Sequence, residues 1–425
     1  MKILNSTINN FDNSLNKLLL QRNKKVQSSS ISVTNIIKDV KKNGDKALLK
    51  YEKKFNQNKT IVPTSNQINN SIKSLDQKVK KAIDIAYDRI YKFHSLQKFK
   101  NISFIDKFKN KLEYKYLPID SVAIYVPGSS ASYPSSVLMN AVPAIVAGVK
   151  RLIMINPGFK GKQNPAVLYA ARKCKIKEIY SIGGPSAVSA AAYGTKKIKK
   201  VDKIVGPGNA YVAEAKRQVF GKVGIDSIAG PSEVLIVCDK SANPNHVAID
   251  LLSQAEHDEL AQAILITDNQ ELALNVEYSV KKFLTKLPRS KIASSSWNSF
   301  GAIILVEDMN EAIKLVNFIA PEHLQLMFKN AKQFVNKIKN AGAIFLGPFT
   351  PEAVGDYIAG PNHVLPTNGT AKFSSGLGVL DFYKRTTIVN FNEKNLNDLG
   401  KHVVTLAKAE GLDAHAMSVS LRLTK

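Results

Sequence analysis

Short apolar runs and amphipathic stretches alternate through the middle of the chain. From about residue 119, runs such as SVAIYV (121–126) and LIMIN (152–156) are each followed by apolar residues at helical spacing. Strands that alternate with helices of about 10–15 residues are typical of βαβ units and a parallel sheet. The rhythm starts again at EVLIVCD (233–239). We therefore expect an α/β fold with two successive Rossmann-like, doubly wound blocks.

Both ends of the chain depart from this rhythm. Residues 1 to about 118 are mainly helical in periodicity, apart from 103–118, which resemble a short hairpin leading into the next unit. After about residue 376, a strand-like segment, FYKRTTIVNF, precedes two helical stretches separated by Gly411. The ends therefore predict a helical N-terminal region and a separate C-terminal tail.

Composition places the chain among globular proteins. It has 425 residues, enough for two or three folded units, with 44% apolar and 22% charged residues. No run of about 18 apolar residues is present, and the N-terminus lacks the apolar core of a secretory signal, so we expect no membrane association. Two cysteines, Cys174 and Cys238, cannot build a disulfide framework, so a cytoplasmic location is the simpler expectation.

The formal net charge of +26 raises the question of a nucleic-acid partner. The lysines are scattered, as at Lys24, Lys53 and Lys98, and do not alternate with aromatic residues in a recognisable binding motif. We interpret the excess as a solvated surface and expect no nucleic-acid partner. The alternative is a basic nucleic-acid-binding protein on a degenerate enzyme fold, which would bind with steep salt dependence.

Three glycine-rich turns lie between a predicted strand and a predicted helix. They are YVPGSSASYPSS (125–136), GGPS (183–186) and GPGNA (206–210), and none is a GxGxxG fingerprint. Doubly wound folds bind ligands at this position, where backbone N–H groups at helix N-termini suit an anion. Each turn alone could be purely structural, but together they indicate a phosphate or dinucleotide cleft.

Two residue pairs in the second block could carry chemistry. Gln254 and His257 are three residues apart at the end of a predicted helix, so both can face a metal ion, although a helix end with a histidine is the simpler interpretation. Glu322 and His323 are adjacent before an apolar strand and offer two proton-transfer groups. Such a pair also occurs by chance on protein surfaces.

Two further pairs lie closer to the C-terminus. Asp356 and His363 belong to GDYIAGPNHVLPT (355–367), a constrained polar segment that could line a site or form a structural crossover. Glu410 and His415 flank a predicted turn, where an exposed junction between helices is the simpler interpretation. The other histidines, which we treat as structural, are His94, His246 and His402.

Taken together and in order, these segments resemble the histidinol dehydrogenases. The resemblance covers about residues 120 to 420, and the N-terminal third matches only in its helical character. The matching segments are YVPG, YPSSVLMNAVPA, VDKIVGPGNAYVAEAKRQVFG, IAGPSEVLIV, DLLSQAEHD, APEHLQL, GDYIAGPNHVLPT, DFYKRT and AEGLDAHA. The resemblance implies a zinc-dependent, NAD-linked oxidation of L-histidinol through L-histidinal to L-histidine, the last step of histidine biosynthesis.

The resemblance also implies roles for individual residues. His323 would take the hydroxyl proton while hydride leaves to NAD, and Glu322 would activate water to hydrate the aldehyde. The ligands of one Zn²⁺ per subunit would be Gln254, His257, Asp356 and His415. The residues contacting histidinol would be Ser232, Gln254, His257, His323, Asp356, His363, Glu410 and His415. The NAD contacts would be Tyr125, Ser186 and Asn209.

A domain organisation follows from the same resemblance. A mainly helical N-terminal region (1–118) would pack with the second block. Residues 119–232 would form the first, NAD-side block, and 233–375 the second block with the zinc and acid/base residues. Residues 376–425 would form a dimerisation tail, through which His415 reaches the partner subunit's site in a homodimer.

Two positions depart from the family's usual pattern. Ser129 stands where a second glycine is usual after Pro127, and Ser186 stands where a glutamine usually helps to hold NAD. A shorter side chain can still bond through water. The alternative is a related NAD-dependent dehydrogenase of the same fold that acts on a different amino alcohol or a sulfonate.

Neither cysteine lies in the matching segments, whereas a typical aldehyde dehydrogenase needs a thiolate nucleophile. Water activated by Glu322 therefore fits the aldehyde step better than a thiohemiacetal.

Overall fold

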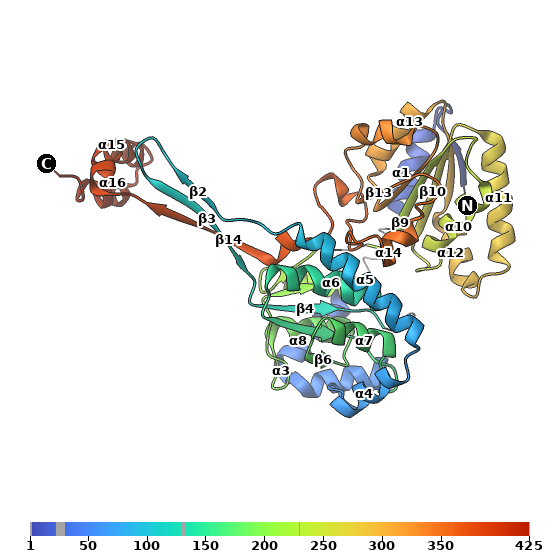
Figure 1. The fold of residues 1–425 in the computed structure, drawn as a ribbon, viewed down its shortest axis with the longest axis horizontal. Helices are drawn as coiled ribbons and strands as arrows, with labels where there is room; N and C mark the ends of the chain where they lie inside the picture. The colour runs from blue at the N-terminus through green and yellow to red at the C-terminus, as the bar shows by residue number, and fades with distance from the viewer. Residues whose placement is uncertain (1, 23–29, 129–132, 229, 425) are drawn as a thin grey trace.

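The computed structural model describes residues 2–22, 30–128, 133–228 and 230–424. Two α/β blocks lie side by side, and a long arm that carries the C-terminus projects away from both (Figure 1). The predicted fold class of two successive α/β blocks is confirmed, because each block is built on its own parallel sheet.

The first sheet has five parallel strands in the order β6-β5-β4-β7-β8. Their bounds are β4 (Ser121–Tyr125), β5 (Arg151–Ile155), β6 (Glu178–Tyr180), β7 (Lys203–Val205) and β8 (Gly224–Ile225). The chain builds outward from β4 in one direction and then returns to β7 on the other side. This reversal of strand order is the switch point at which doubly wound folds bind ligands.

Every residue of β4 is buried, because helices cover both faces of the first sheet. Val122 and Ile124 pack on one face, and Ala123 and Tyr125 pack on the other. The helices that follow the strands are α6 (Pro134–Ala147), α7 (Pro165–Lys173), α8 (Gly184–Tyr193) and α9 (Ala210–Val219). This two-sided burial explains the uninterrupted apolar run in the sequence.

The second sheet has six parallel strands in the order β1-β11-β10-β9-β12-β13. Their bounds are β1 (Lys2–Asn5), β9 (Glu233–Cys238), β10 (Gln262–Thr267), β11 (Ala302–Leu305), β12 (His323–Met327) and β13 (Ala343–Leu346). The accompanying helices are α1 (Phe11–Gln21), α10 (Pro244–Ala255), α11 (Gln270–Leu284), α12 (Ser290–Phe300), α13 (Met309–Ile319) and α14 (Glu352–Tyr357).

The N-terminal region is divided among the two blocks and the arm, so the prediction that it packs with the second block is wrong for most of its length. Only β1 and α1 join the second block. The helices α3 (Ser30–Phe55), α4 (Ser65–Lys73) and α5 (Gln77–Ser95) cover the first block instead. Val33 and Ile37 of α3, for example, belong to the same core cluster as Ile153 of β5. Helical periodicity shows that a helix has an apolar face, but not which core that face covers.

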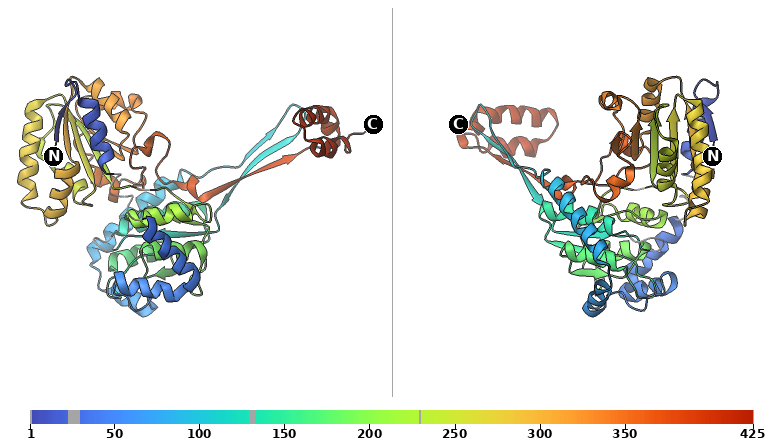
Figure 2. Two further views of the ribbon diagram at one scale, coloured as in Figure 1. Left: turned by 180° about the vertical axis from the view of Figure 1, so that it is seen from behind. Right: turned by 45° about the vertical axis from the view of Figure 1, so that its right-hand side comes forward.

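The arm is an antiparallel sheet of three strands in the order β14-β3-β2, followed by two helices. Its elements are β2 (Ile102–Ile105), β3 (Lys111–Pro118), β14 (Tyr383–Asn390), α15 (Glu393–Ala409) and α16 (Asp413–Ser420). The predicted hairpin at 103–118 therefore extends into an arm by pairing with the C-terminal tail. Both views in Figure 2 show the arm well clear of the two blocks.

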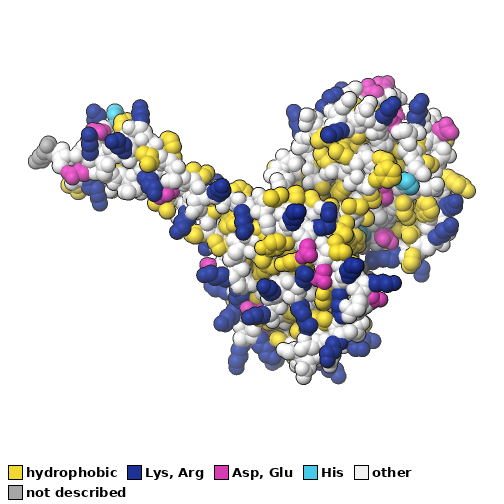
Figure 3. Space-filling view, in the orientation of Figure 1, with side chains coloured by type: hydrophobic (Ala, Val, Ile, Leu, Met, Phe, Trp, Pro, Cys, Tyr) yellow, Lys and Arg dark blue, Asp and Glu magenta, His cyan; other side chains and the backbone are white. Residues whose placement is uncertain are grey.

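Lysine and arginine side chains are spread over the blocks and the arm, and Figure 3 shows no single dense patch of them on the visible face. Among the helices that the structure describes, none has both the length and the apolar character that crossing a bilayer requires.

Candidate functional site

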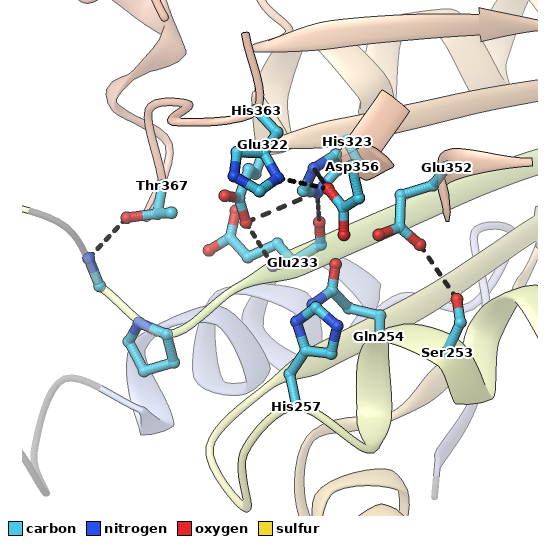
Figure 4. A network of polar contacts seen from close by, with 12 residues as sticks. Glu233, Ser253, Gln254, His257, Glu322, His323, Glu352, Asp356, His363 and Thr367 are labelled. Carbon is cyan, nitrogen blue, oxygen red and sulfur yellow. Dashed lines mark hydrogen bonds and ion pairs between the residues drawn. The ribbon is translucent and has the colours of Figure 1, made fainter. Parts of the chain in front are cut away.

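A cluster of buried polar side chains lies at the amino edge of the second sheet, where β9 and β12 begin (Figure 4). The helices α10 and α14 run back toward this edge, so their C-terminal ends bring Gln254, His257 and Asp356 to it. Doubly wound folds usually bind ligands at the carboxyl edge of the sheet. The second block therefore places its polar groups at the opposite edge from the usual one.

Glu322 and His323 lie at the start of β12 and are almost fully buried. The main chain of Glu233 holds both: its N–H donates to Glu322 Oε2 at 2.8 Å, and its carbonyl oxygen lies 2.9 Å from His323 Nδ1. Because a carbonyl oxygen only accepts, Nδ1 carries a proton, which leaves Nε2 of the neutral ring with a lone pair.

His323 Nε2 is buried and has no hydrogen-bond partner among the described residues. It lies 4.0 Å from Asp356 Oδ1. A buried polar atom without a partner is costly, and at such positions a ligand or an ion often supplies the missing bond. This free lone pair makes His323 a suitable proton acceptor.

Burial raises the pKa of Glu322 to about 8, with a further contribution from the charge of Glu233. A carboxyl group whose pKa lies near neutrality can both hold and release a proton under physiological conditions. The pair therefore has the chemistry of two proton-transfer groups. Glu233 is an orienting residue that the sequence did not reveal.

Gln254 and His257 come together at the end of α10, with Gln254 Nε2 3.5 Å from His257 Nδ1. Gln254 is fully buried, yet its Oε1 has no partner within the described part of the chain. Burial lowers the pKa of His257, which keeps the imidazole neutral and able to ligate a metal.

Asp356 Oδ1 accepts a hydrogen bond from His363 Nδ1 at 3.1 Å. Burial acts to raise the pKa of Asp356, but the bond from His363 and the neighbouring histidines outweigh it and lower the pKa to about 2. Asp356 is therefore a buried carboxylate surrounded by nitrogen atoms. This is a suitable oxygen donor for a cation.

Glu352 belongs to the same cluster, although the sequence analysis did not select it. Its Oε2 accepts from Ser253 Oγ at 3.0 Å, and burial raises its pKa to about 8. Donor atoms of His323, Glu352 and Asp356 lie within 4.8 Å of one another. One signal was present in the sequence, because Glu352 is four residues before Asp356 and shares a helix face with it.

Two predicted site residues lie far from this cluster. Both are exposed: Glu410 directly follows α15 and His415 lies on α16, at the end of the arm and remote from the second block of the same chain (Figure 1). Ser232, by contrast, directly precedes Glu233, and its carbonyl oxygen accepts from Gln262 N at the edge of the cluster.

The three predicted NAD contacts lie at the carboxyl edge of the first sheet: Tyr125 ends β4, Ser186 follows β6 and Asn209 follows β7. The Tyr125 hydroxyl accepts from Gly184 N at 3.0 Å, and the Ser186 hydroxyl donates to Gly183 O at 3.0 Å. Asn209 caps α9 and is exposed. Ser186 is buried and bonded within its own turn, and Ser129, the other departure, lies outside the described residues.

The turn that precedes Asn209 is clamped by a buried ion pair. Gly206 N donates to Asp226 Oδ2 at 2.7 Å, and Lys216, which pairs with Asp226, donates to Gly206 O at 3.1 Å. Gly206 has a φ of +112°, and a Cβ there would lie 2.2 Å from Tyr125 O. Only glycine fits such a position, so the turn has one defined shape.

A cavity of about 760 Å³ lies between α4, α7 and the loops that follow β4 and β5, and its lining contains none of Tyr125, Ser186 and Asn209. Its lining includes Gly128, Asn156, Pro157 and Gln163. Its position at the carboxyl edge of the first sheet is that of a ligand cleft in doubly wound folds.

Neither cysteine can act as a nucleophile in these surroundings. Both are buried, and burial raises the pKa of Cys174 to about 12 and that of Cys238 further still. Their thiols therefore stay protonated, which supports the expectation that any aldehyde step uses water.

The fold and the buried acid/base cluster define the chain as an α/β enzyme. The family model for histidinol dehydrogenase matches residues 19–423. The histidinol dehydrogenase of Pelagibacter ubique is 64% identical over the whole of both chains, and histidinol dehydrogenase 1 of Trichormus variabilis is 50% identical over 100% of this chain and 99% of its own. The crystal structure of histidinol dehydrogenase from Elizabethkingia anophelis is 37% identical, covers 99% of this chain and 98% of its own, and has a TM-score of 0.91.

The chain belongs to the histidinol dehydrogenase family, whose members are NAD-dependent oxidoreductases. The resemblance stated from the nine sequence segments is therefore confirmed.

The raised pKa of Glu322 predicts a pH dependence of stability in the zinc-free protein. Since the folded state holds this proton up to about pH 8 and an ordinary glutamate releases it near 4.5, the stabilisation is full below 4.5 and is lost as the pH rises toward 8. We expect Glu322→Gln to become more stable relative to wild type, by a few kcal/mol in free energy of unfolding, between pH 5 and pH 9.

Urea unfolding at several pH values measures this difference. Glu271→Gln, at an exposed position of α11, is the control and should show a constant offset from wild type. Parallel stability curves for Glu322→Gln and wild type would contradict the prediction.

Proposed function

We propose that the chain is a zinc-dependent histidinol dehydrogenase that oxidises L-histidinol through L-histidinal to L-histidine, the last step of histidine biosynthesis. The observation that carries the proposal is the unpartnered Nε2 of His323, held by Glu233 beside Glu322 and facing Asp356. An alcohol oxidation needs a base to take the hydroxyl proton as hydride leaves, and His323 offers such a base.

The metal would be held by Gln254, His257 and Asp356, with His415 supplied by the partner subunit. The three residues of this chain fit the role: an unpartnered amide oxygen, a neutral imidazole and an ionised carboxylate. Nitrogen and oxygen donors of this kind suit zinc. When bound, one zinc ion per subunit would hold the imidazole and amino groups of histidinol and orient the substrate.

Glu352 would support this set without being one of its ligands. Its Oε2 accepts a hydrogen bond from Ser253 Oγ, which ties this carboxyl group to the end of α10 beside Gln254.

In the first oxidation, His323 Nε2 would take the proton of the substrate hydroxyl while the carbon gives up a hydride to NAD, which would yield L-histidinal and NADH. The bond from Nδ1 to the carbonyl of Glu233 fixes the tautomer and stabilises the charged ring. In the second step, Glu322 would remove a proton from water as it adds to the aldehyde carbon, and the protonated His323 would return its proton to the aldehyde oxygen. This gives the hydrate and restores the neutral ring of His323. The hydrate would then lose a proton to His323 Nε2 and a hydride to a second NAD, which would give L-histidine.

NAD would bind on the first block, at the turns of Tyr125, Ser186 and Asn209. The Ser186 hydroxyl donates within its own turn, so it would meet NAD through a water molecule where the family's usual glutamine makes a contact of its own. Ser232 and His363, at the edge of the acid/base cluster, would contact the substrate.

The working enzyme would be a homodimer whose sites are shared. Arm residues with apolar side chains are exposed to solvent in the single chain, including Phe104, Val389 and Leu406. A partner subunit would cover them and would bring its Glu410 and His415 to the second block. Under this proposal, residues 119–232 form the NAD side, 233–375 the zinc and acid/base side, and 376–425 the exchanged tail. A cytoplasmic location agrees with two free cysteines.

Formation of NADH tests this proposal. Purified protein given L-histidinol and NAD should produce two NADH per histidinol, lose this activity on chelation and regain it with zinc. A folded, zinc-loaded protein that yields no NADH would reject the proposal. Activity on another amino alcohol in place of histidinol would reject histidinol as the substrate.

The acid/base roles predict separate effects on the two oxidations. His323→Ala should slow the oxidation of histidinol by roughly 10²–10⁴-fold, because the proton acceptor is lost. Glu322→Gln should spare the oxidation of histidinol relative to that of histidinal, because only the second step needs activated water. Single-turnover kinetics with each substrate separates the steps, and equal losses in both for Glu322→Gln would contradict this division.

A further inference from the structure

We infer that Arg22 is a positioning residue for the Glu322–His323 pair and for Ser232, an inference that rests on the proposed function. Arg22 directly follows α1 and is only 1% exposed. A buried guanidinium is costly unless an ion pair and several hydrogen bonds compensate for its lost hydration. The partners of Arg22 therefore indicate which parts of the structure this buried side chain holds in place.

Arg22 links three segments that meet behind the site. Its Nη1 pairs with Glu233 Oε1 at 3.0 Å and donates to Gln262 Oε1 at 3.1 Å. Its Nη2 donates to Pro231 O at 2.6 Å and to Asn368 Oδ1 at 3.3 Å. One planar guanidinium thus fixes the turn before β9, the start of β10 and the loop that follows His363.

These contacts lead directly to the reacting groups. Arg22 holds the side chain of Glu233, whose main chain bonds Glu322 and His323. It also holds the carbonyl of Pro231, which is adjacent in sequence to Ser232. Arg22 contacts neither of the acid/base side chains itself, so it acts on them through Glu233.

Loss of Arg22 would change both charge and geometry. The Glu233 carboxylate would remain buried with the Asn368 N–H, 3.0 Å away, but without a countercharge. Glu233 would then shift or take up a proton, and its main chain would move with it. Displacements of about 1 Å at reacting groups can cost on the order of 100-fold in rate. Lysine at position 22 would restore the positive charge but not the bidentate hydrogen bonding of the guanidinium group.

The test uses the full-length, zinc-loaded enzyme with Arg22→Met and Arg22→Lys. We expect kcat to fall at least tenfold in Arg22→Met and by less in Arg22→Lys, while the KM for NAD stays within twofold of wild type. The control is Arg151→Met, because Arg151 makes a similar set of bonds to Glu178 and to the carbonyls of Lys199 and Lys200 in the first block. This control should lose stability but keep kcat.

Adding Glu233→Gln to Arg22→Met separates positioning from folding. Glutamine keeps the main-chain bonds and removes the unpaired charge, so the double variant should recover part of the kcat lost in Arg22→Met. Unchanged kcat in Arg22→Met, with a loss of thermal stability alone, would overturn the inference.

A spectroscopic measurement tests the inference even if the proposed activity is absent. Nitrogen-15 NMR of the histidines, with His323→Gln for assignment, reports which nitrogen of His323 carries the proton. We expect the Nδ1-protonated form in wild type and a mixture of tautomers in Arg22→Met. Identical His323 signals in both proteins would reject the positioning role, whereas wild-type protein that makes no NADH but shows this change would reject only the proposed function.

Discussion

The candidate site depends on the main chain of one residue, Glu233, at the first position of β9. Inside a buried parallel sheet, N–H and C=O groups are used by neighbouring strands, and only the ends of the strands leave such groups for side chains. At this end, the N–H of Glu233 holds the Glu322 carboxylate and its C=O holds the His323 ring. A rigid sheet therefore sets the protonated nitrogen of His323 and leaves the other nitrogen facing Asp356.

The two blocks carry their candidate ligand-binding residues at opposite edges of their sheets. The first block carries its glycine-rich turns at the carboxyl edge, as in other doubly wound folds, and a buried Lys216–Asp226 pair fixes one of them. The second block carries its acid/base and metal-binding candidates at the amino edge, which α10 and α14 reach with their C-terminal ends. We propose that NAD binds at the carboxyl edge of the first sheet and histidinol at the amino edge of the second. Hydride would then pass directly from histidinol to NAD.

The order of strands and helices could be predicted because strands buried on both faces leave plain apolar runs, such as the one in β4. The pairing of β3 with β14 could not, because it joins segments far apart in the sequence. The acid/base and zinc candidates were found through the family resemblance, since spacing alone left simpler interpretations open. Glu352 and Arg22 were missed because their significance comes from burial and partners, which a single sequence does not display.

We propose that a working site needs the second block of one subunit and the arm of its partner. Mixing His323→Ala with His415→Ala subunits tests it directly. Each variant alone should be inactive, but a hybrid dimer contains one site with an intact block and an intact arm, so random mixing should restore about a quarter of the wild-type activity. A mixture as inactive as the separate variants, with hybrid dimers shown to form, would contradict the account.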